Sequence, residues 1–195
     1  MNVFDFDKTV YDGDSTVDLC LYLMGRYPVV ISDFISNLPV VISYKRGKIS
    51  KTGMKESLYK CFRRVPNMEK ELERFWDGHM KNVEKWYLDM KREDDVIISA
   101  SPEFLLAECC RRLGIKYLIA SRVDPKTGKY DGLNCYGREK PKRFDERFGS
   151  ERREDIEAFY SDSYSDAPMA VISKKAYLVK KHSLTEWDHT KNREV

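Results

Sequence analysis

Two hydrophobic patterns alternate along the 195-residue chain. Short apolar runs rich in β-branched and aromatic residues, each closed by polar or turn-forming residues, predict β-strands. Between residues 15 and 88, apolar positions instead recur at helical spacing, with little strand character. The predicted strands cover residues 3–6, 95–102, 116–123, 156–160 and 176–179. The helical stretch therefore separates the first predicted strand from the other four.

Capping and breaking residues set the bounds of the predicted helices in this stretch. Asp14 or Ser15 is placed to cap the first helix. The apolar segment 29–44 is expected to be helical in pieces and to break near Pro39. A long amphipathic helix is expected to include residues 72–86.

Helices also follow the later strands. Gly114 ends a helix that begins near residue 103, and Ser101 is expected to cap it rather than to contact a ligand. A turn at residues 124–129 predicts a small hairpin that reaches residue 134 or 135. A further helix is expected over residues 141–148.

The order of these elements predicts an α/β fold. Strands that alternate with helices form a parallel sheet with helices on both faces, as in a Rossmann-like core. We expect residues 1–14 and 89–195 to form this core and residues 15–88 to form an inserted all-helical cap.

Composition narrows the class of protein. The 35 Lys and Arg residues nearly balance the 32 Asp and Glu residues, so the net charge of +3 gives no case for a nucleic-acid partner. The five cysteines are an odd number without CxxC spacing. They indicate a reducing compartment, and we expect a cytoplasmic protein.

No membrane-spanning helix is expected. The most apolar window, residues 27–44, is interrupted by Asp33, Asn37 and two prolines. The chain starts in strand-like residues without a basic stretch before an apolar one, so we expect no signal peptide. The oligomeric state stays open.

Distinctive polar residues follow several of the predicted strands. Ligands bind at the carboxyl ends of the strands in an open parallel sheet, where these side chains are expected to converge. Converging carboxylates need a cation, and hard oxygen ligands favour Mg²⁺, which often works beside a phosphate group. The set comprises Asp5, Asp7, Thr9, Ser99, Lys140, Asp162 and Asp166.

Four short motifs in order resemble those of the haloacid dehalogenase-like superfamily. Residues 5–9 (Asp-Phe-Asp-Lys-Thr) are similar to its DxDx[TV] motif, and the strand that ends at Ser99 is similar to its second motif. Lys140 resembles the third motif, and Asp162 with Asp166 resembles the fourth, of DxxxD form. The motifs span most of the chain, and the family places a helical cap between the first two.

This resemblance implies a role for each motif residue. Asp5 would be the nucleophile and a Mg²⁺ ligand. Asp7 would be the general acid and base, and its backbone carbonyl would bind the metal. Ser99 would bond the phosphoryl group, and Lys140 would hold nucleophile and phosphoryl group together.

The remaining roles concern the metal and the phosphate loop. Asp162 would bind Mg²⁺, and Asp166 would bind it or orient its ligands. Thr9 would support the first loop, and it is grouped with Ala100 among the phosphate-site residues.

The chain is most similar to the phosphoserine-phosphatase-like branch of the superfamily. Asp14 falls where that enzyme has a glutamate that reads the substrate amine, so it either contacts substrate or caps a helix. The cap arginine that reads the substrate carboxylate has no clear counterpart. Ser161 and Ser163 replace the glycines that flank the aspartate of the fourth motif.

The expected function is a Mg²⁺-dependent phosphatase that forms an aspartyl phosphate. A small phosphorylated metabolite is the first choice of substrate. A lipid phosphate, handled at the membrane surface beneath an apolar cap, is the alternative, and a non-catalytic phosphate-binding module is another.

Overall fold

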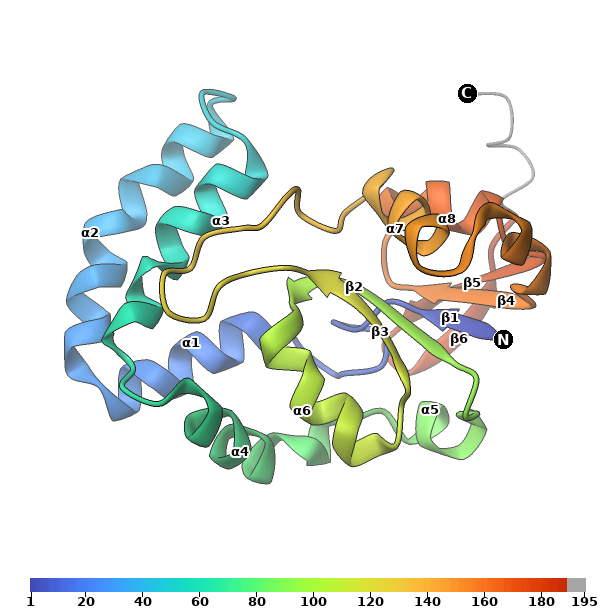
Figure 1. Cartoon of the computed structure of the whole chain (residues 1–195), viewed down its shortest axis with the longest axis horizontal. Helices are drawn as coiled ribbons and strands as arrows, with labels where there is room; N and C mark the ends of the chain where they lie inside the picture. The colour runs from blue at the N-terminus through green and yellow to red at the C-terminus, as the bar shows by residue number, and fades with distance from the viewer. Residues whose placement is uncertain (189–195) are drawn as a thin grey trace.

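A computed structural model describes residues 1–188, so the last seven residues of the predicted core lie outside it. Six strands form one sheet in the order β3-β2-β1-β4-β5-β6 (Figure 1). The first five are parallel and the sixth is antiparallel. They are β1 (Asn2–Phe4), β2 (Val96–Pro102), β3 (Tyr117–Ser121), β4 (Ala158–Ser161), β5 (Lys175–Lys180) and β6 (Ser183–Glu186). The predicted α/β fold is confirmed.

The sheet is covered on both faces. One apolar layer contains Phe4 and Ile97 from the strands, with Leu106 of α6 (Glu103–Leu113). The opposite layer contains Val3, with Phe144 of α7 (Glu139–Phe148) and side chains of the short α8 (Ala167–Val171). Figure 1 shows α7 and α8 above the strands and α6 below them. The alternation along β1 follows from the period of two in an extended chain.

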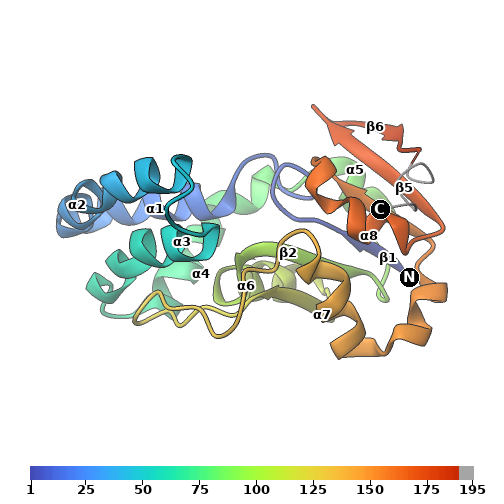
Figure 2. The ribbon, with the colours of Figure 1, turned by 90° about the horizontal axis from the view of Figure 1, so that it is seen from above.

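The inserted segment contains helices and no strand within residues 15–88. Its helices are α1 (Ser15–Arg26), α2 (Pro28–Lys45), α3 (Lys51–Tyr59), α4 (Met68–His79) and α5 (Lys85–Met90). The first three form a lobe that projects from the sheet end (Figures 1 and 2). The other two lie against the core: Trp76 Nε1 donates to the Leu105 carbonyl at 2.8 Å, and the Phe4 and Tyr87 rings lie 5.0 Å apart.

Two helix predictions are wrong. The segment 29–44 forms one helix that passes through Pro39, although a proline inside a helix removes a hydrogen bond. Packing of α2 against α1 and α3 offsets this loss. The helix predicted across 72–86 is interrupted, because the Asp12 N–H bonds the Asn82 carbonyl and the Glu84 N–H bonds the Val10 carbonyl, both at 2.8 Å.

Two strand predictions also differ from the structure. The hairpin expected over residues 124–135 is reduced to a single antiparallel bridge between Val123 and Tyr130. Strand β6 was not predicted, because its four residues are all exposed and show no apolar run. Among residues 1–188, none of the helices has the length and apolar character needed to cross a bilayer.

Candidate functional site

The turn after β1 fixes the first two aspartates. The Phe6 carbonyl accepts hydrogen bonds from the N–H groups of residues 9, 10 and 11, and Lys8 adopts a positive φ of 57°. The Asp5 N–H donates to the Tyr160 carbonyl on β4 at 2.8 Å. The rings of Phe6 and Tyr11 stack on each other within the turn, with their centres 5.8 Å apart. Asp5 and Asp7 thus both line one cavity.

A buried lysine lies between two buried carboxylates. Lys140, at the start of α7, donates from Nζ to Asp5 Oδ1 at 2.8 Å and to Asp166 Oδ2 at 2.7 Å. Burial lowers the pKa of Lys140, but both carboxylates oppose this and hold it above its usual value. Burial raises the pKa of Asp5 to about 7, against the opposing effect of Lys140 and with a further rise from Asp166.

The fourth motif follows β4. Asp166 also accepts a hydrogen bond from Ser161 Oγ at 2.8 Å, while its buried Oδ1 has no hydrogen-bond partner among the described residues. Asp162 is partly buried and lines the same cavity. Burial raises its pKa, and nearby Lys8 opposes the shift. The fourth motif therefore supplies two carboxylates to the site: Asp166, which Lys140 bridges to Asp5, and Asp162.

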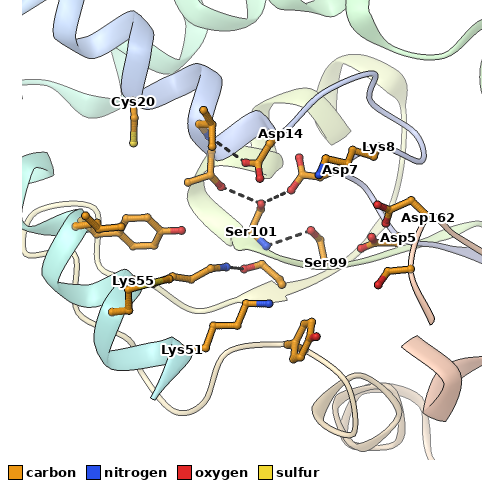
Figure 3. Close-up of a pocket in the computed structure, with 18 of the residues that line it drawn as sticks. Asp5, Asp7, Lys8, Asp14, Cys20, Lys51, Lys55, Ser99, Ser101 and Asp162 are labelled. Carbon is orange, nitrogen blue, oxygen red and sulfur yellow. Dashed lines mark hydrogen bonds between the residues drawn. The ribbon is translucent and has the colours of Figure 1, made fainter. Parts of the chain in front are cut away.

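Asp7 is held by the first cap helix and by β2. The Ser15 N–H donates to Asp7 Oδ1 at 2.7 Å, and Ser101 Oγ donates to Asp7 Oδ2. The Ser101 hydroxyl also lies 2.9 Å from Thr16 Oγ1 (Figure 3). Burial, and then the charge of Asp14, raise the pKa of Asp7. A carboxyl with a raised pKa is suited to donate a proton.

Asp14 caps α1, because its Oδ1 accepts from the Val17 N–H at 3.0 Å. It also lines the cavity. Ser101 was expected to cap α6, and this expectation is wrong. Pro102 occupies that N-cap and makes no side-chain cap, while the Ser101 hydroxyl faces Asp7 across 94 residues of sequence. Ser101 is therefore a site residue that the sequence did not reveal.

The other predicted phosphate-site residues lie in different places. Ser99 lines the cavity, and its Oγ accepts from the Ser101 N–H at 3.1 Å. Ala100 also lines it. Thr9 is fully buried and is not among the lining residues, and its hydroxyl has no partner within residues 1–188. Thr9 thus lies in the packed turn rather than at the cavity wall.

The cavity has a volume of about 500 Å³ and lies between the strand ends and the lobe. The aspartates, Lys140 and the serines just described line it at the strand ends. Figure 3 shows Asp7 beside Ser101, and Asp5 near Ser99 and Asp162. Lys55 of α3 reaches across from the lobe, and its Nζ donates to the Ala100 carbonyl at 2.8 Å and to Asn134 Oδ1 at 3.3 Å. Burial, followed by the charge of Lys51, lowers the pKa of Lys55 to about 8.

Lys51 and Lys55 were not predicted as site residues. Lys51 Nζ lies 3.5 Å from the centre of the Tyr136 ring, and both lysines line the cavity. Their spacing of four residues places them on one face of α3. That spacing, directly after the helix cap Ser50, is the signal that the sequence offered.

The donor set fits a divalent cation. Burial raises the pKa of Asp5, Asp7 and Asp162, and a cation would offset that cost. The unpartnered Asp166 Oδ1 is a free oxygen donor of the kind Mg²⁺ selects. Within residues 1–188, one other group of side chains could ligate a metal. It consists of Asp12, Glu84 and His182 at the surface, whose potential ligand atoms lie within 4.8 Å of one another.

That surface group is explained by an ion pair. His182 Nδ1 lies 2.7 Å from Glu84 Oε1, and both the hydrogen bond and the charge raise the His182 pKa. The predicted ligands Asp5, Asp162 and Asp166 do not form so tight a cluster among the described residues, since Lys140 lies between two of them.

The chain is similar in sequence to known proteins. A family model described as haloacid dehalogenase-like hydrolase matches residues 3–171. Protein CicA of Caulobacter vibrioides is 37% identical over 90 residues, which cover 43% of this chain and 40% of that protein. A probable phosphatase of Mycobacterium tuberculosis is 32% identical over 105 residues, or 48% of this chain and 37% of that protein. The chain spans less than half the length of these two relatives.

Solved structures share the fold. A protein of unknown function from Bordetella pertussis Tohama I matches with a TM-score of 0.75 at 20% identity, over 90% of this chain and 87% of that one. A substrate-bound phosphoserine phosphatase matches with a TM-score of 0.53 at 17% identity, over 89% and 82% of the two chains. At these identities the likeness concerns the fold.

Proposed function

From the premise that this chain belongs to the haloacid dehalogenase-like hydrolases, we propose that it is a Mg²⁺-dependent phosphatase that forms an aspartyl phosphate. The family match confirms the resemblance first inferred from the four motifs. One observation carries the proposal. The buried bridge Asp5–Lys140–Asp166 lies beside Asp7, whose carboxyl is held by Ser101, at the base of a single cavity.

The first step transfers the phosphoryl group to Asp5. A carboxylate oxygen of Asp5 attacks phosphorus while the bond from phosphorus to the leaving oxygen breaks. Lys140 orients the attacking carboxylate and offers positive charge to the phosphoryl oxygens. Asp7, whose pKa is raised by burial, gives a proton to the leaving alcohol.

The second step regenerates the enzyme. Asp7, now a carboxylate, takes a proton from water, whose oxygen attacks phosphorus and releases phosphate from Asp5. The hydroxyl of Ser99, which lines the cavity, would bond a phosphoryl oxygen. Asp5, Asp162, Asp166 and the backbone carbonyl of Asp7 would hold Mg²⁺. When bound, Mg²⁺ supplies positive charge to the phosphoryl oxygens.

The proposal includes a cytoplasmic location. All five cysteines are free and buried, as expected of a protein kept in a reducing compartment. The sequence favoured a small phosphorylated metabolite as the substrate. The catalytic residues themselves do not distinguish one leaving group from another, so the substrate class has to come from the lobe end of the cavity.

Replacement of the nucleophile tests the proposal. With p-nitrophenyl phosphate and Mg²⁺, Asp5→Asn is expected to lower kcat by at least about a thousandfold, because an amide is a poor nucleophile. Asp12→Asn, an exposed aspartate in the same turn, is the matched control and should keep its rate. Removal of Mg²⁺ with EDTA should abolish turnover by both. Turnover by Asp5→Asn near that of the control would refute the proposal.

A further inference from the structure

The lobe end of the cavity is apolar. Its wall is formed by side chains from all three projecting helices: Val17, Leu21 and Met24 of α1, Phe34 of α2, and Met54 and Leu58 of α3. The charged groups of the cavity lie mainly toward the strand ends, where Lys55 already bonds the Ala100 carbonyl. A hydrophilic leaving group placed against this wall would lose its hydrogen bonds to water without replacement. A hydrocarbon chain would lose none.

The same wall continues to the outer surface. Leu21 lines the cavity and is also 60% exposed, and Val17, one turn before it, is 52% exposed. Contiguous exposed apolar patches commonly mark ligand-binding grooves or membrane-interaction sites. The apolar end of the cavity is therefore continuous with the surface of the lobe, so a ligand bound there could enter it.

The outer face of α2 carries an exposed apolar stripe. Ile31, Ile35, Leu38 and Ile42 are 42%, 58%, 43% and 53% exposed. Their spacing of four, three and four residues places them along one side of the helix. In a helix at the surface of a globular protein this side is normally polar. We therefore define these four residues as the α2 stripe.

Positive charge borders the α2 stripe. Asp33, the one acidic residue of α2, is paired with Arg64 at 2.9 Å and with Arg63 at 3.5 Å. The helix ends in Lys45, and the exposed residues Arg46 and Lys48 follow in the turn to α3. An apolar stripe that ends in basic residues matches an anionic lipid surface, whose head groups attract lysine and arginine.

We propose that the substrate is a lipid phosphate monoester taken from an anionic membrane surface, with the α2 stripe resting on the lipid and one hydrocarbon chain in the apolar end of the cavity. This inference rests on the phosphatase function proposed above. It explains three features together: the phosphate site at the base, the apolar wall that leads to the surface, and the basic turn beside the stripe. It differs from the small metabolite that the sequence favoured, and the two tests below distinguish these substrate classes.

The first test uses soluble n-alkyl phosphates from ethyl to octyl. Each methylene that enters the apolar wall should raise kcat/KM roughly fourfold until the wall is filled. Met54→Gln and Leu21→Gln place an amide in that wall and should flatten the dependence on chain length. Leu184→Gln, an exposed leucine on β6, is the control and should keep it.

The second test uses vesicles of phosphatidylcholine with and without phosphatidylglycerol. Wild-type protein should sediment with the anionic vesicles and bind the neutral ones less. The double variant Ile35→Glu, Ile42→Glu should bind anionic vesicles at least about tenfold more weakly, because two charges oppose insertion. Leu184→Glu should bind as wild type does.

The outcomes separate the two proposals. Hydrolysis of every alkyl phosphate at one rate, or equal vesicle binding by the double variant, overturns the lipid substrate and leaves the phosphatase intact. No hydrolysis of any ester with Mg²⁺ overturns both. A wild-type dimer that the double variant converts to monomer, with no vesicle binding, would make the α2 stripe a self-interface and also overturn the lipid substrate.

Discussion

At the scale of single residues, the geometry of the site depends on the buried bridge that Lys140 forms with two of its carboxylates. Lys140 is the cation that bonds Asp5 and Asp166 directly, and it is almost completely buried. Such a bridge costs desolvation and contributes little net stability. Its value is geometric, because it fixes the attacking oxygen of Asp5 toward the cavity.

Ser101 offers a test at this scale. Its hydroxyl orients the Asp7 carboxyl, so Ser101→Ala should lower kcat about ten- to hundredfold while KM stays nearly constant. Ser173→Ala is the control, because Ser173 is equally buried but bonds the Ala170 carbonyl away from the cavity. Steady-state kinetics of both variants decide the point. Unchanged kcat in Ser101→Ala would show that Asp7 needs no such support.

At the scale of elements, one buried glutamate ties the lobe to the core. Glu71 of α4 accepts hydrogen bonds from Tyr22 Oη at 2.7 Å, Arg26 Nε at 2.8 Å and Tyr27 Oη at 3.1 Å, and it pairs with Arg74 at 2.8 Å. Burial raises its pKa, but these partners together lower it below its usual value. The network joins α1 to α4 at the root of the lobe.

Glu71→Gln should lower the free energy of unfolding by about 1–2 kcal/mol at neutral pH, a modest value because the two arginines are partly exposed. A lowered pKa stabilises the fold above the unfolded value of 4.5, and this contribution is lost as the pH falls through the folded value. The difference between wild type and variant should therefore shrink below about pH 4.5. Denaturant unfolding across pH measures it, with the exposed Glu73→Gln as control. A difference independent of pH would exclude an ionised Glu71.

Helices and strands differ in how far local sequence signals predict them. Strands β1 to β5 and the polar residues at their ends were predictable, because apolar runs and turn residues are local signals. The end of α4 was not, since backbone bonds from residues 10 and 12 draw residues 82–84 out of the helix. The contact of Ser101 with Asp7 joins residues 94 positions apart and leaves no local pattern. Lys55 was missed because its partners Ala100 and Asn134 lie on other elements.

At the scale of the whole molecule, the cavity exists only between the lobe and the strand ends. Lys55 crosses this gap from α3 to the end of β2. Gly128 fits closely beneath the lobe, because a Cβ atom there would lie 2.4 Å from the Tyr59 carbonyl oxygen. These contacts fix how far the apolar wall stands from the phosphate site.

Lys55→Met tests this arrangement. Loss of the Lys55 ammonium group should lower kcat/KM about ten- to hundredfold. Lys55 joins the lobe to the end of β2 and also faces the phosphate end of the cavity. Lys60→Met, an exposed lysine just after α3, should behave as wild type. An unchanged kcat/KM for Lys55→Met would show that turnover depends neither on this bond nor on this charge.

The covalent intermediate on Asp5 is the central claim. Asp7→Asn lacks the base that activates water, but p-nitrophenyl phosphate has a leaving group that needs no acid. Acid quench of this variant with that substrate and Mg²⁺, followed by peptide mass spectrometry, should show one phosphoryl group on Asp5 that hydroxylamine removes. Phosphate on Ser99, Ser101 or any other residue, or no phosphorylated protein from an enzyme that turns over, would contradict the account.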